Sequence, residues 1–350
     1  MKYQRELLKP LSGYVPGEQP KPGERIIKLN TNENPYPPSP RVMDAITAVG
    51  ADGLRRYPDP NSVDLRKTAA ELYGFAGPEW AIAGNGSDEL LAMIIRTFSD
   101  PGDTIWSAYP TYSLYDTLVK LHGAKYASVD LDQDFNMTPE FFTRKGRVFF
   151  LARPNAPSGV SSPRAEVEKL CKSFDGLVVI DEAYADFDRD DCMDFPRRFE
   201  NAIVTRTFSK SYSLCGLRAG LAFARPEVIA ELMKTKDSYN LSAASQAGAT
   251  AALRDQAHMK ANAAKVIATR TRLVEQLRGI GFTVPESRGN YVLARWARRP
   301  STKEIFTGLR DRKIVVRYFE ARGLTDALRI SVGTDAETDA LLAAIREIVK

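Results

Sequence analysis

The sequence has few of the residues on which metal sites and serine hydrolases depend. It contains two histidines, His122 and His258, and neither lies near a cysteine, aspartate or glutamate at metal-ligand spacing. This scarcity disfavours a zinc site and a Ser-His-Asp hydrolase, and we expect no bound metal. The three cysteines, Cys171, Cys192 and Cys215, are widely spaced and form no C-x-x-C motif. They predict buried free thiols, and neither a disulfide framework nor a zinc knuckle.

Long apolar runs and clusters of one charge are also missing. No apolar stretch approaches the ~20 residues that span a bilayer, and the first residues lack the apolar core of a secretory signal. The net charge of +5 is small for 350 residues, and lysines and arginines form no long run of the kind a nucleic-acid arm carries. We therefore expect a cytoplasmic protein that binds neither membrane nor nucleic acid.

The composition is that of a folded chain, with 43% hydrophobic and 27% charged residues. Residues 1–29 are polar and rich in proline and glycine, which predicts an irregular N-terminal arm. From 30 to 255, short β-branched runs alternate with helical patterns, the order typical of a large α/β domain with a mainly parallel sheet. A long helical stretch over residues 242–280 leads into a tail, and residues 256–350 predict a smaller α+β domain.

Three loops at expected strand ends carry polar residues that could perform chemistry. The first, residues 84–89, joins a short apolar run to a helical pattern. Its small residues, and the free N–H groups at the start of a helix, favour a bound phosphate. A plain helix cap formed by Ser87 or Asp88 would explain the same residues.

The second loop begins at Asp181, directly after the apolar run of residues 177–180. Open α/β sheets bind ligands at this carboxyl end of their strands. An acid there could hold a metal, but the chain has no G-x-x-x-x-G-K-[ST] phosphate loop, which weakens the case for a nucleotide site. A carboxylate that pairs with a protonated ring nitrogen is the better interpretation.

The third loop follows the apolar run near 203–206 and contains Thr207, Ser209, Lys210 and Arg218. A lysine in a dry site loses its proton more easily and can attack an aldehyde, while hydroxyls and an arginine bind a phosphate. A solvated lysine in a turn is the alternative. Together the three loops supply an amine, an acid and phosphate donors, a combination that fits one cofactor.

Eight separated motifs in this order resemble those of the fold-type I pyridoxal-phosphate-dependent aminotransferases, and they are most similar to the histidinol-phosphate branch of that family. They extend over nearly the whole chain. The motifs are LNTNENPYPPSP, RYPDP, GNGSDELL, YPTYSLY, RPNAPSG, VVIDEAY, TFSKSYSLCGLRAG and LRISVGT. The resemblance implies a seven-stranded sheet between helices, pyridoxal 5'-phosphate as cofactor, amino-acid and 2-oxo-acid substrates, and a homodimer with shared active sites.

The resemblance also implies roles for individual residues. Lys210 would hold the cofactor as a Schiff base and move the substrate's proton, Asp181 would keep the ring nitrogen protonated, and Tyr184 would donate to the phenolic oxygen. Tyr112 would stack on the ring, whereas the neighbouring Tyr109 would simply pack. The phosphate would lie against Ser87, Asp88, Thr207, Ser209 and Arg218, and against Tyr57 of the neighbouring subunit.

One motif departs from the family pattern. The family's Asn-Pro-Asn-Asn-Pro-Thr-Gly reads Arg-Pro-Asn-Ala-Pro-Ser-Gly over residues 153–159. The asparagine before the second proline usually contacts the phenolic oxygen, and that position is Ala156 here. Either Asn155 takes its place in cofactor binding or Tyr184 makes the contact alone.

For the substrate, the resemblance implies that Arg317 and Arg329 face the phosphate of histidinol phosphate and the carboxylate of glutamate. Arg317 could instead be a solvated cation at a strand edge. Tyr14 on the arm would close over the substrate. The expected reaction is histidinol-phosphate transamination in L-histidine biosynthesis. An aromatic amino-acid aminotransferase, a threonine-phosphate decarboxylase, a non-catalytic cofactor-binding regulator and a ligand-free structural protein are the alternatives.

Overall fold

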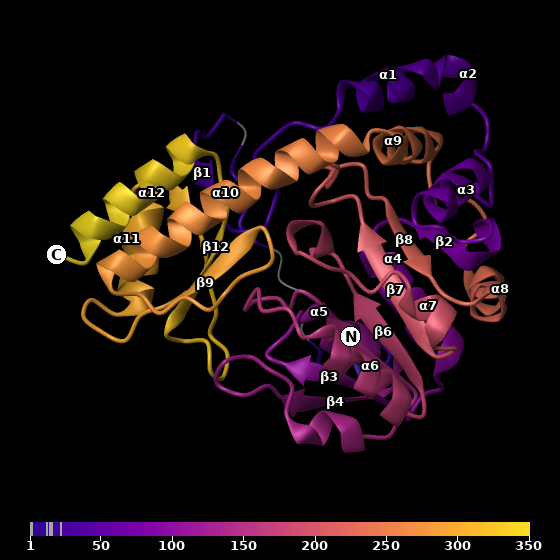
Figure 1. The fold of residues 1–350 in the computed structure, drawn as a ribbon, viewed down its shortest axis with the longest axis horizontal. Helices are drawn as coiled ribbons and strands as arrows, with labels where there is room; N and C mark the ends of the chain where they lie inside the picture. Colours follow the sequence, from indigo (N-terminus) through magenta and orange to yellow (C-terminus); the bar gives the residue numbers. More distant parts are fainter. Residues whose placement is uncertain (1–2, 12, 14–16, 22) are drawn as a thin grey trace.

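The computed structural model describes residues 3–350 apart from 12, 14–16 and 22. A seven-stranded sheet forms the centre of the larger lobe, in the order β2-β8-β7-β6-β5-β3-β4 (Figure 1). Strand β8 is antiparallel to both neighbours, and every other pair is parallel, which confirms the expected mainly parallel sheet. The strands are β2 (Ala81–Gly84), β3 (Thr104–Tyr109), β4 (Lys125–Asp130), β5 (Val148–Ala152), β6 (Leu177–Asp181), β7 (Ala202–Thr207) and β8 (Gly220–Phe223).

The three polar loops leave this sheet at one edge. Asp181 is the last residue of β6 and Thr207 is the last residue of the parallel strand β7. Strand β2 points the same way as β7, because both are antiparallel to the strand β8 between them. The loop after β2 therefore meets the other two at the carboxyl edge, where such sheets bind ligands.

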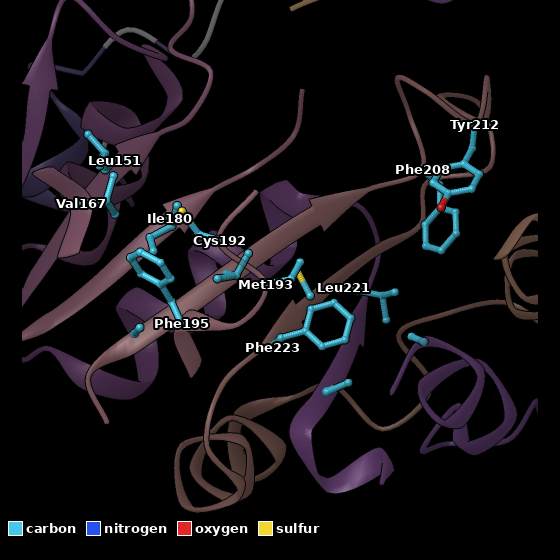
Figure 2. Packing of buried hydrophobic residues seen from close by; sticks show 14 of the residues in the cluster. Leu151, Val167, Ile180, Cys192, Met193, Phe195, Phe208, Tyr212, Leu221 and Phe223 are labelled. Carbon is cyan, nitrogen blue, oxygen red and sulfur yellow. The ribbon is translucent and has the colours of Figure 1, made fainter. Parts of the chain in front are cut away.

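Both faces of the sheet are buried, as parallel sheets require. Successive residues of a strand point to opposite faces, so Val179 and Ile180 pack into two different apolar clusters. Figure 2 shows the cluster that contains Ile180, where Phe195 and Cys192 pack beside it and Phe223, on the antiparallel strand β8, continues the apolar layer. This packing fixes the strand ends that carry the loops.

Helices cover the two faces. One face is covered by α4 (Ser87–Phe98), α5 (Leu114–His122) and α8 (Pro226–Thr235), and the other by α3 (Val63–Leu72), α6 (Arg164–Ser173), α7 (Phe195–Arg198) and α9 (Ala243–Arg254). Helices α1 (Pro40–Ala48) and α2 (Gly50–Leu54) precede α3, and α1 packs on α9.

The helical stretch expected over residues 242–280 is two helices, because Asp255 interrupts it. The Asp255 carboxylate accepts from the backbone N–H of His258 and so caps the start of α10 (Gln256–Ile280). Figure 1 shows α10 running from α9 into the smaller lobe. Its first half packs into the larger core through Val266, and its second half into the smaller core through Leu273.

The smaller lobe packs a three-stranded antiparallel sheet, β11-β12-β9, against α10, α11 and α12. The run of residues 313–319 reads as one strand in the sequence but forms two, because β10 pairs with the arm and β11 pairs with β12. The proposed domain boundaries stay predictions, since β1 of the arm joins this lobe. The elements are β1 (Ile27–Lys28), β9 (Tyr291–Arg295), α11 (Thr302–Asp311), β10 (Ile314–Val315), β11 (Arg317–Tyr318), β12 (Ala327–Ser331) and α12 (Asp335–Ile348).

Two further expectations concern cysteines and membranes. All three cysteines are free, and Cys171 and Cys192 are buried as expected. Cys215 is only half-buried, because it lies on the wall of the cavity described below.

Within the part of the chain that the structure describes, no helix combines the length and the apolar character needed to cross a bilayer.

Candidate active site

A cavity of about 400 Å³ lies where the carboxyl edge of the large sheet faces the smaller lobe. It is lined by residues from all three polar loops, from the smaller lobe and from the arm at Gly17. Eleven of the residues that the sequence assigned to cofactor or substrate binding share this cavity. They are Ser87, Asp88, Tyr112, Asp181, Tyr184, Thr207, Ser209, Lys210, Arg218, Arg317 and Arg329.

The amine of Lys210 lies inside this site and not in open solvent. The residue is half-buried, and its Nζ donates to the backbone oxygen of Thr31 at 3.2 Å. Nζ also lies 5.6 Å from the ring centroid of Tyr184, within reach of that aromatic face. The Lys210 amine and the Asp181 carboxylate therefore line one enclosed space.

The carboxylate of Asp181 is 5% exposed and is held by neutral donors. The Tyr115 hydroxyl donates to Oδ2 at 2.7 Å, and the Thr205 hydroxyl donates to Oδ1 at 3.2 Å. Burial raises the pKa of Asp181 above its ordinary value, because the hydrogen bonds only partly offset the loss of hydration. In the described chain no lysine or arginine pairs with this carboxylate. A ligand cation would complete the site.

The start of α4 forms one side of an anion site. Gly86 precedes the helix at φ +84°, and no side chain caps it, so the first N–H groups face the cavity unblocked. A Cβ at Gly86 would lie 2.5 Å from Nη2 of Arg218, and a Cβ at Gly220 would lie 2.7 Å from the Ser87 nitrogen. Only glycine permits this close approach of helix, strand and guanidinium.

Arg218 forms the other side of the anion site. Its backbone has φ +54°, a conformation that a non-glycine residue adopts at a cost. Its Nη1 lies 3.4 Å from the Ser209 hydroxyl and its Nη2 lies 3.4 Å from Oδ2 of Asp88. The Thr207 hydroxyl donates to Ser209 at 3.1 Å. A planar guanidinium and two hydroxyls thus face the helix start.

The side chain of Asp88 serves a different purpose from its neighbours. Its carboxylate would repel a phosphate, and it instead accepts from Arg218 and from the Tyr112 hydroxyl, the latter at 3.3 Å. Asp88 therefore fixes the guanidinium and the aromatic ring. Its own contribution to anion binding would come from the backbone N–H in the first turn of α4.

Arg317 and Arg329 line the opposite wall, on β11 and β12. Nη2 of Arg329 donates to the backbone oxygen of Asn30 at 2.7 Å, whereas its Nε is buried and has no partner in the described chain. A buried donor without a partner is costly, so a ligand oxygen would satisfy it.

Two sequence-based assignments fall outside the cavity wall, and a third cannot be placed. Asn155 is buried, and its amide ties its own loop to Pro110 and Ser158, with donated bonds of 3.0 Å each. Tyr57 is 80% exposed and stacks on Tyr239, with ring centroids 4.3 Å apart. Tyr14 lies outside the described residues. The roles of all three stay predictions.

Sequence reasoning missed three residues that hydrogen-bond to the functional side chains: Tyr115 and Thr205 bond to Asp181, and Asn32 bonds to Tyr184. Tyr115 belongs to the YPTYSLY motif, three residues after Tyr112, and this last tyrosine of the motif was the available signal. Thr205, two residues before Thr207 on β7, gave the same kind of signal. Asn32 belongs to the LNTNENPYPPSP motif and donates from Nδ2 to the Tyr184 hydroxyl at 3.0 Å.

The residues present fit pyridoxal 5'-phosphate. A cradle at Gly86 that a Cβ would fill, the uncapped start of α4 and Arg218 suit its phosphate. A buried carboxylate without a cation suits a protonated ring nitrogen, and the Lys210 amine suits an aldehyde carbon. The three requirements of the cofactor are met by separate loops around one cavity.

Comparisons with known proteins agree with this geometry. A family model described as aminotransferase class I and II matches residues 24–345. A histidinol-phosphate aminotransferase from Geotalea daltonii is 48% identical over 338 residues, which cover 97% of each chain. A protein of the same name from Synechocystis is 47% identical over 337 residues, covering 96% of this chain and 95% of its own.

A solved structure is similar over the whole chain. The histidinol-phosphate aminotransferase from Sinorhizobium meliloti, solved in complex with pyridoxal-5'-phosphate, matches with a TM-score of 0.89 and 26% identity. The match covers 100% of this chain and 98% of that one. The fold is therefore that of a chain solved with this cofactor bound.

Proposed function

The chain belongs to the class I and II aminotransferase family, and from this premise we infer that it is a pyridoxal-phosphate-dependent histidinol-phosphate transaminase. It converts L-histidinol phosphate and 2-oxoglutarate to imidazole acetol phosphate and L-glutamate, a step of L-histidine biosynthesis. One observation carries the assignment of the site: Lys210, Asp181 and the two arginines Arg317 and Arg329 line the same cavity.

Lys210 is the catalytic amine in this proposal. Pyridoxal phosphate, when bound, supplies an aldehyde carbon that joins to amines and a ring that accepts the electrons released at the substrate's reacting carbon. Lys210 holds the cofactor in the resting enzyme. Once the substrate amine had taken its place, the free Nζ would remove a proton from the substrate's reacting carbon and deliver it to the former aldehyde carbon of the cofactor. Its half-buried position beside the Tyr184 ring limits competition from water.

Asp181 and Tyr184 set the charge of the cofactor ring. Asp181 lies at the end of β6 and pairs with the ring nitrogen, which keeps that nitrogen protonated and the ring able to accept electrons. Tyr184 donates to the phenolic oxygen. Loss of the Asp181 charge should therefore cost more in rate than in substrate binding.

The phosphate group lies against the start of α4. Ser87, Ser209 and Arg218 hold its oxygens, and a planar guanidinium is well suited to grip two of them at once. Asp88 keeps Arg218 in place, and Tyr112 supplies an aromatic face beside the ring. Asn155 would either contact the phenolic oxygen in place of the asparagine missing at Ala156 or leave that contact to Tyr184 alone.

The substrate's anionic end lies against the smaller lobe. Arg317 takes the phosphate of histidinol phosphate and Arg329 takes a carboxylate of glutamate, and both use one cavity in alternate halves of the reaction cycle. The arm passes this wall at Gly17, three residues after Tyr14 in the sequence, which supports a role for Tyr14 in closing over the substrate. Free cysteines are usual in the reducing cytoplasm, where we place the reaction.

The enzyme works as a homodimer in this proposal. Five of the eight large apolar side chains that are exposed in the described chain lie between positions 43 and 63 or at Tyr239. Exposed apolar surface of this kind marks interaction sites, and a second copy would cover it. The five are Met43, Leu54, Tyr57, Val63 and Tyr239. Tyr57, which stacks on Tyr239, would contact the phosphate held by the partner.

The function is tested by supplying purified protein and cofactor with histidinol phosphate, phenylalanine or threonine phosphate in turn. We expect histidinol phosphate to bleach the visible absorbance of the bound cofactor and 2-oxoglutarate to restore it, with glutamate as product. Release of carbon dioxide from threonine phosphate would indicate a decarboxylase. A phosphate-free amino acid preferred by orders of magnitude would contradict the role of Arg317.

A further inference from the structure

Three consecutive residues that follow the arm, Asn30, Thr31 and Asn32, hold three functional side chains. The backbone oxygen of Asn30 accepts from Arg329, and the backbone oxygen of Thr31 accepts from Lys210. The side chain of Asn32 donates to the hydroxyl of Tyr184 at 3.0 Å. Of these three residues, Asn30 and Thr31 hold Arg329 and Lys210 through backbone oxygens, whereas Asn32 holds Tyr184 through its side chain. A substitution of Asn32 therefore changes its contact with Tyr184.

The amide of Asn32 is held in one orientation by Ser331. The backbone N–H of Asn32 donates to the Ser331 hydroxyl at 2.8 Å. The Ser331 hydroxyl donates in turn to Oδ1 of Asn32 at 2.9 Å. Because Oδ1 faces β12, Nδ2 faces Tyr184. Asn32 is 1% exposed, so water cannot easily replace either partner.

The backbone of Asn32 suits this task. Its φ is +56°, in the left-handed region that asparagine and aspartate tolerate better than other side chains. Asn290 of the smaller lobe donates to its backbone oxygen at 2.9 Å. The residue is thus fixed from both sides, and its amide has little freedom to turn.

This direction of bonding decides what Tyr184 can do. The Tyr184 oxygen accepts from Asn32, so the single hydroxyl proton is not used in that bond. On the basis of the proposed function, we propose that Asn32 is a positioning residue, which keeps the Tyr184 hydroxyl turned as a donor toward the cofactor's phenolic oxygen. Asn32 does not touch the cofactor in this account and acts through Tyr184.

The same hydrogen bonds connect Tyr184 to strand β12, which carries the substrate-binding residue Arg329. Ser331 lies two residues after Arg329 on β12, and residues two apart share one face of a strand. The strand that holds the substrate's anion is therefore also the strand that orients Asn32, and through it Tyr184. The smaller lobe must be in place for the tyrosine proton to point into the cavity.

The test is a pH titration of the visible absorbance of the holoenzyme, without substrate. A bond donated by Tyr184 stabilises negative charge on the cofactor's phenolic oxygen. The proton on the Lys210 nitrogen that is joined to the cofactor is then lost at a lower pH, so the midpoint of the absorbance change falls. In Asn32→Asp the carboxylate would accept the Tyr184 proton and withdraw it from the cavity. We expect the midpoint to rise by about 1 pH unit, as in Tyr184→Phe.

The background of the Tyr184→Phe variant separates this effect from the added negative charge. If Asn32 acts through the hydroxyl, Asn32→Asp should produce little further rise in Tyr184→Phe. A full further rise there, or an unmoved midpoint in Asn32→Asp alone, would overturn the inference. Ser331→Ala leaves Asn32 itself intact, and by releasing the amide it should give part of the rise.

The failure of this inference is distinct from the failure of the proposed function. A wild-type protein that gains no visible absorbance with pyridoxal phosphate would contradict the function itself. A wild-type protein that gains the absorbance, with Asn32→Asp and Ser331→Ala titrating like wild type, would contradict the role of Asn32 alone.

Discussion

Arg317 and Arg329 lie directly opposite each other, at paired positions on the antiparallel strands β11 and β12. The guanidinium carbon of each lies 5.7 Å from the ring centroid of Phe319, and both side chains line the cavity. Like charges at directly opposite positions destabilise a sheet, so this pairing works against folding. A ligand with one or more negative charges offsets the repulsion, which is what the proposed substrates bring.

Replacement of Arg317 should affect the phosphorylated substrate more than glutamate. Arg317→Ala removes a charge-assisted bond worth about 1.5–3 kcal/mol, so kcat/KM for histidinol phosphate should fall roughly 10- to 100-fold. Rapid mixing of the holoenzyme with each amino donor measures the two halves of the cycle separately. Arg312→Ala, at an exposed arginine paired with Glu347, is the matched control. Equal losses with both donors would contradict the assignment.

The stability gained on cofactor binding should depend on pH through Asp181. Burial raises its pKa above 3.8, so the folded apoprotein binds this proton more tightly than the unfolded chain. The group's contribution is therefore full below pH 3.8 and is lost as pH rises through the folded value. When the cofactor is bound, its protonated ring nitrogen pairs with the ionised Asp181 carboxylate and so restores the stability that is lost at higher pH.

The increase in Tm on adding pyridoxal phosphate should thus grow as the pH rises above 3.8 and through the raised folded-state pKa of Asp181. In Asp181→Asn the side chain at position 181 does not titrate, so part of the rise with pH in the cofactor-induced Tm increase should disappear. Calorimetry of apoprotein and holoenzyme at each pH provides the measurement. An identical pH dependence in wild type and Asp181→Asn would show that the pairing does not occur.

Mixing two impaired variants tests whether Tyr57 serves the partner's site. Lys210→Ala disables its own site, and Tyr57→Ala should weaken phosphate binding in the neighbouring one. A dimer of one copy of each then has one site with both defects and one intact site. An equal mixture after subunit exchange should recover about a quarter of wild-type activity. No recovery, although mixed dimers are detected, would mean that Tyr57 acts within its own chain.

Arg206 should be important for stability although it does not line the cavity. Its guanidinium donates to Glu182 at 3.0 Å and to Asp186, and Asp186 also accepts from Ser211, the residue after Lys210. Arg206→Met leaves the half-buried Asp186 without its cation and leaves the buried Glu182 with Arg153 alone, at 3.7 Å, at a cost of about 3–5 kcal/mol. Urea unfolding of the apoprotein measures it. A cost below about 1 kcal/mol, similar to that of an exposed arginine, would contradict this view.

Much of the site could be predicted from sequence because its loops follow buried strands. Apolar runs identify β6 and β7, and the topology of open α/β sheets brings Asp181 and Lys210 to one edge. Small residues before α4 and an arginine after Lys210 indicated an anion site, and the structure places them together. These signals are local in the chain, which is why a single sequence carries them.

The rest depends on contacts between distant parts of the chain. Asn32 and Ser331 are 299 positions apart, and no periodicity or spacing predicts their hydrogen bonds. The division of residues 313–319 into β10 and β11 is set by their different partners, β1 and β12. Asn155 lay in a recognised motif, but its amide bonds to its own loop could not be read from the pattern.

The central claim is that the amine of Lys210 binds the cofactor covalently, and borohydride reduction tests it most directly. Reduction of the holoenzyme followed by peptide mass analysis should place a phosphopyridoxyl group on Lys210 in the large majority of molecules. The Lys210→Arg variant should remain unlabelled and inactive while it stays folded. A label on another lysine of the wild type, with Lys210 unmodified, would contradict the account.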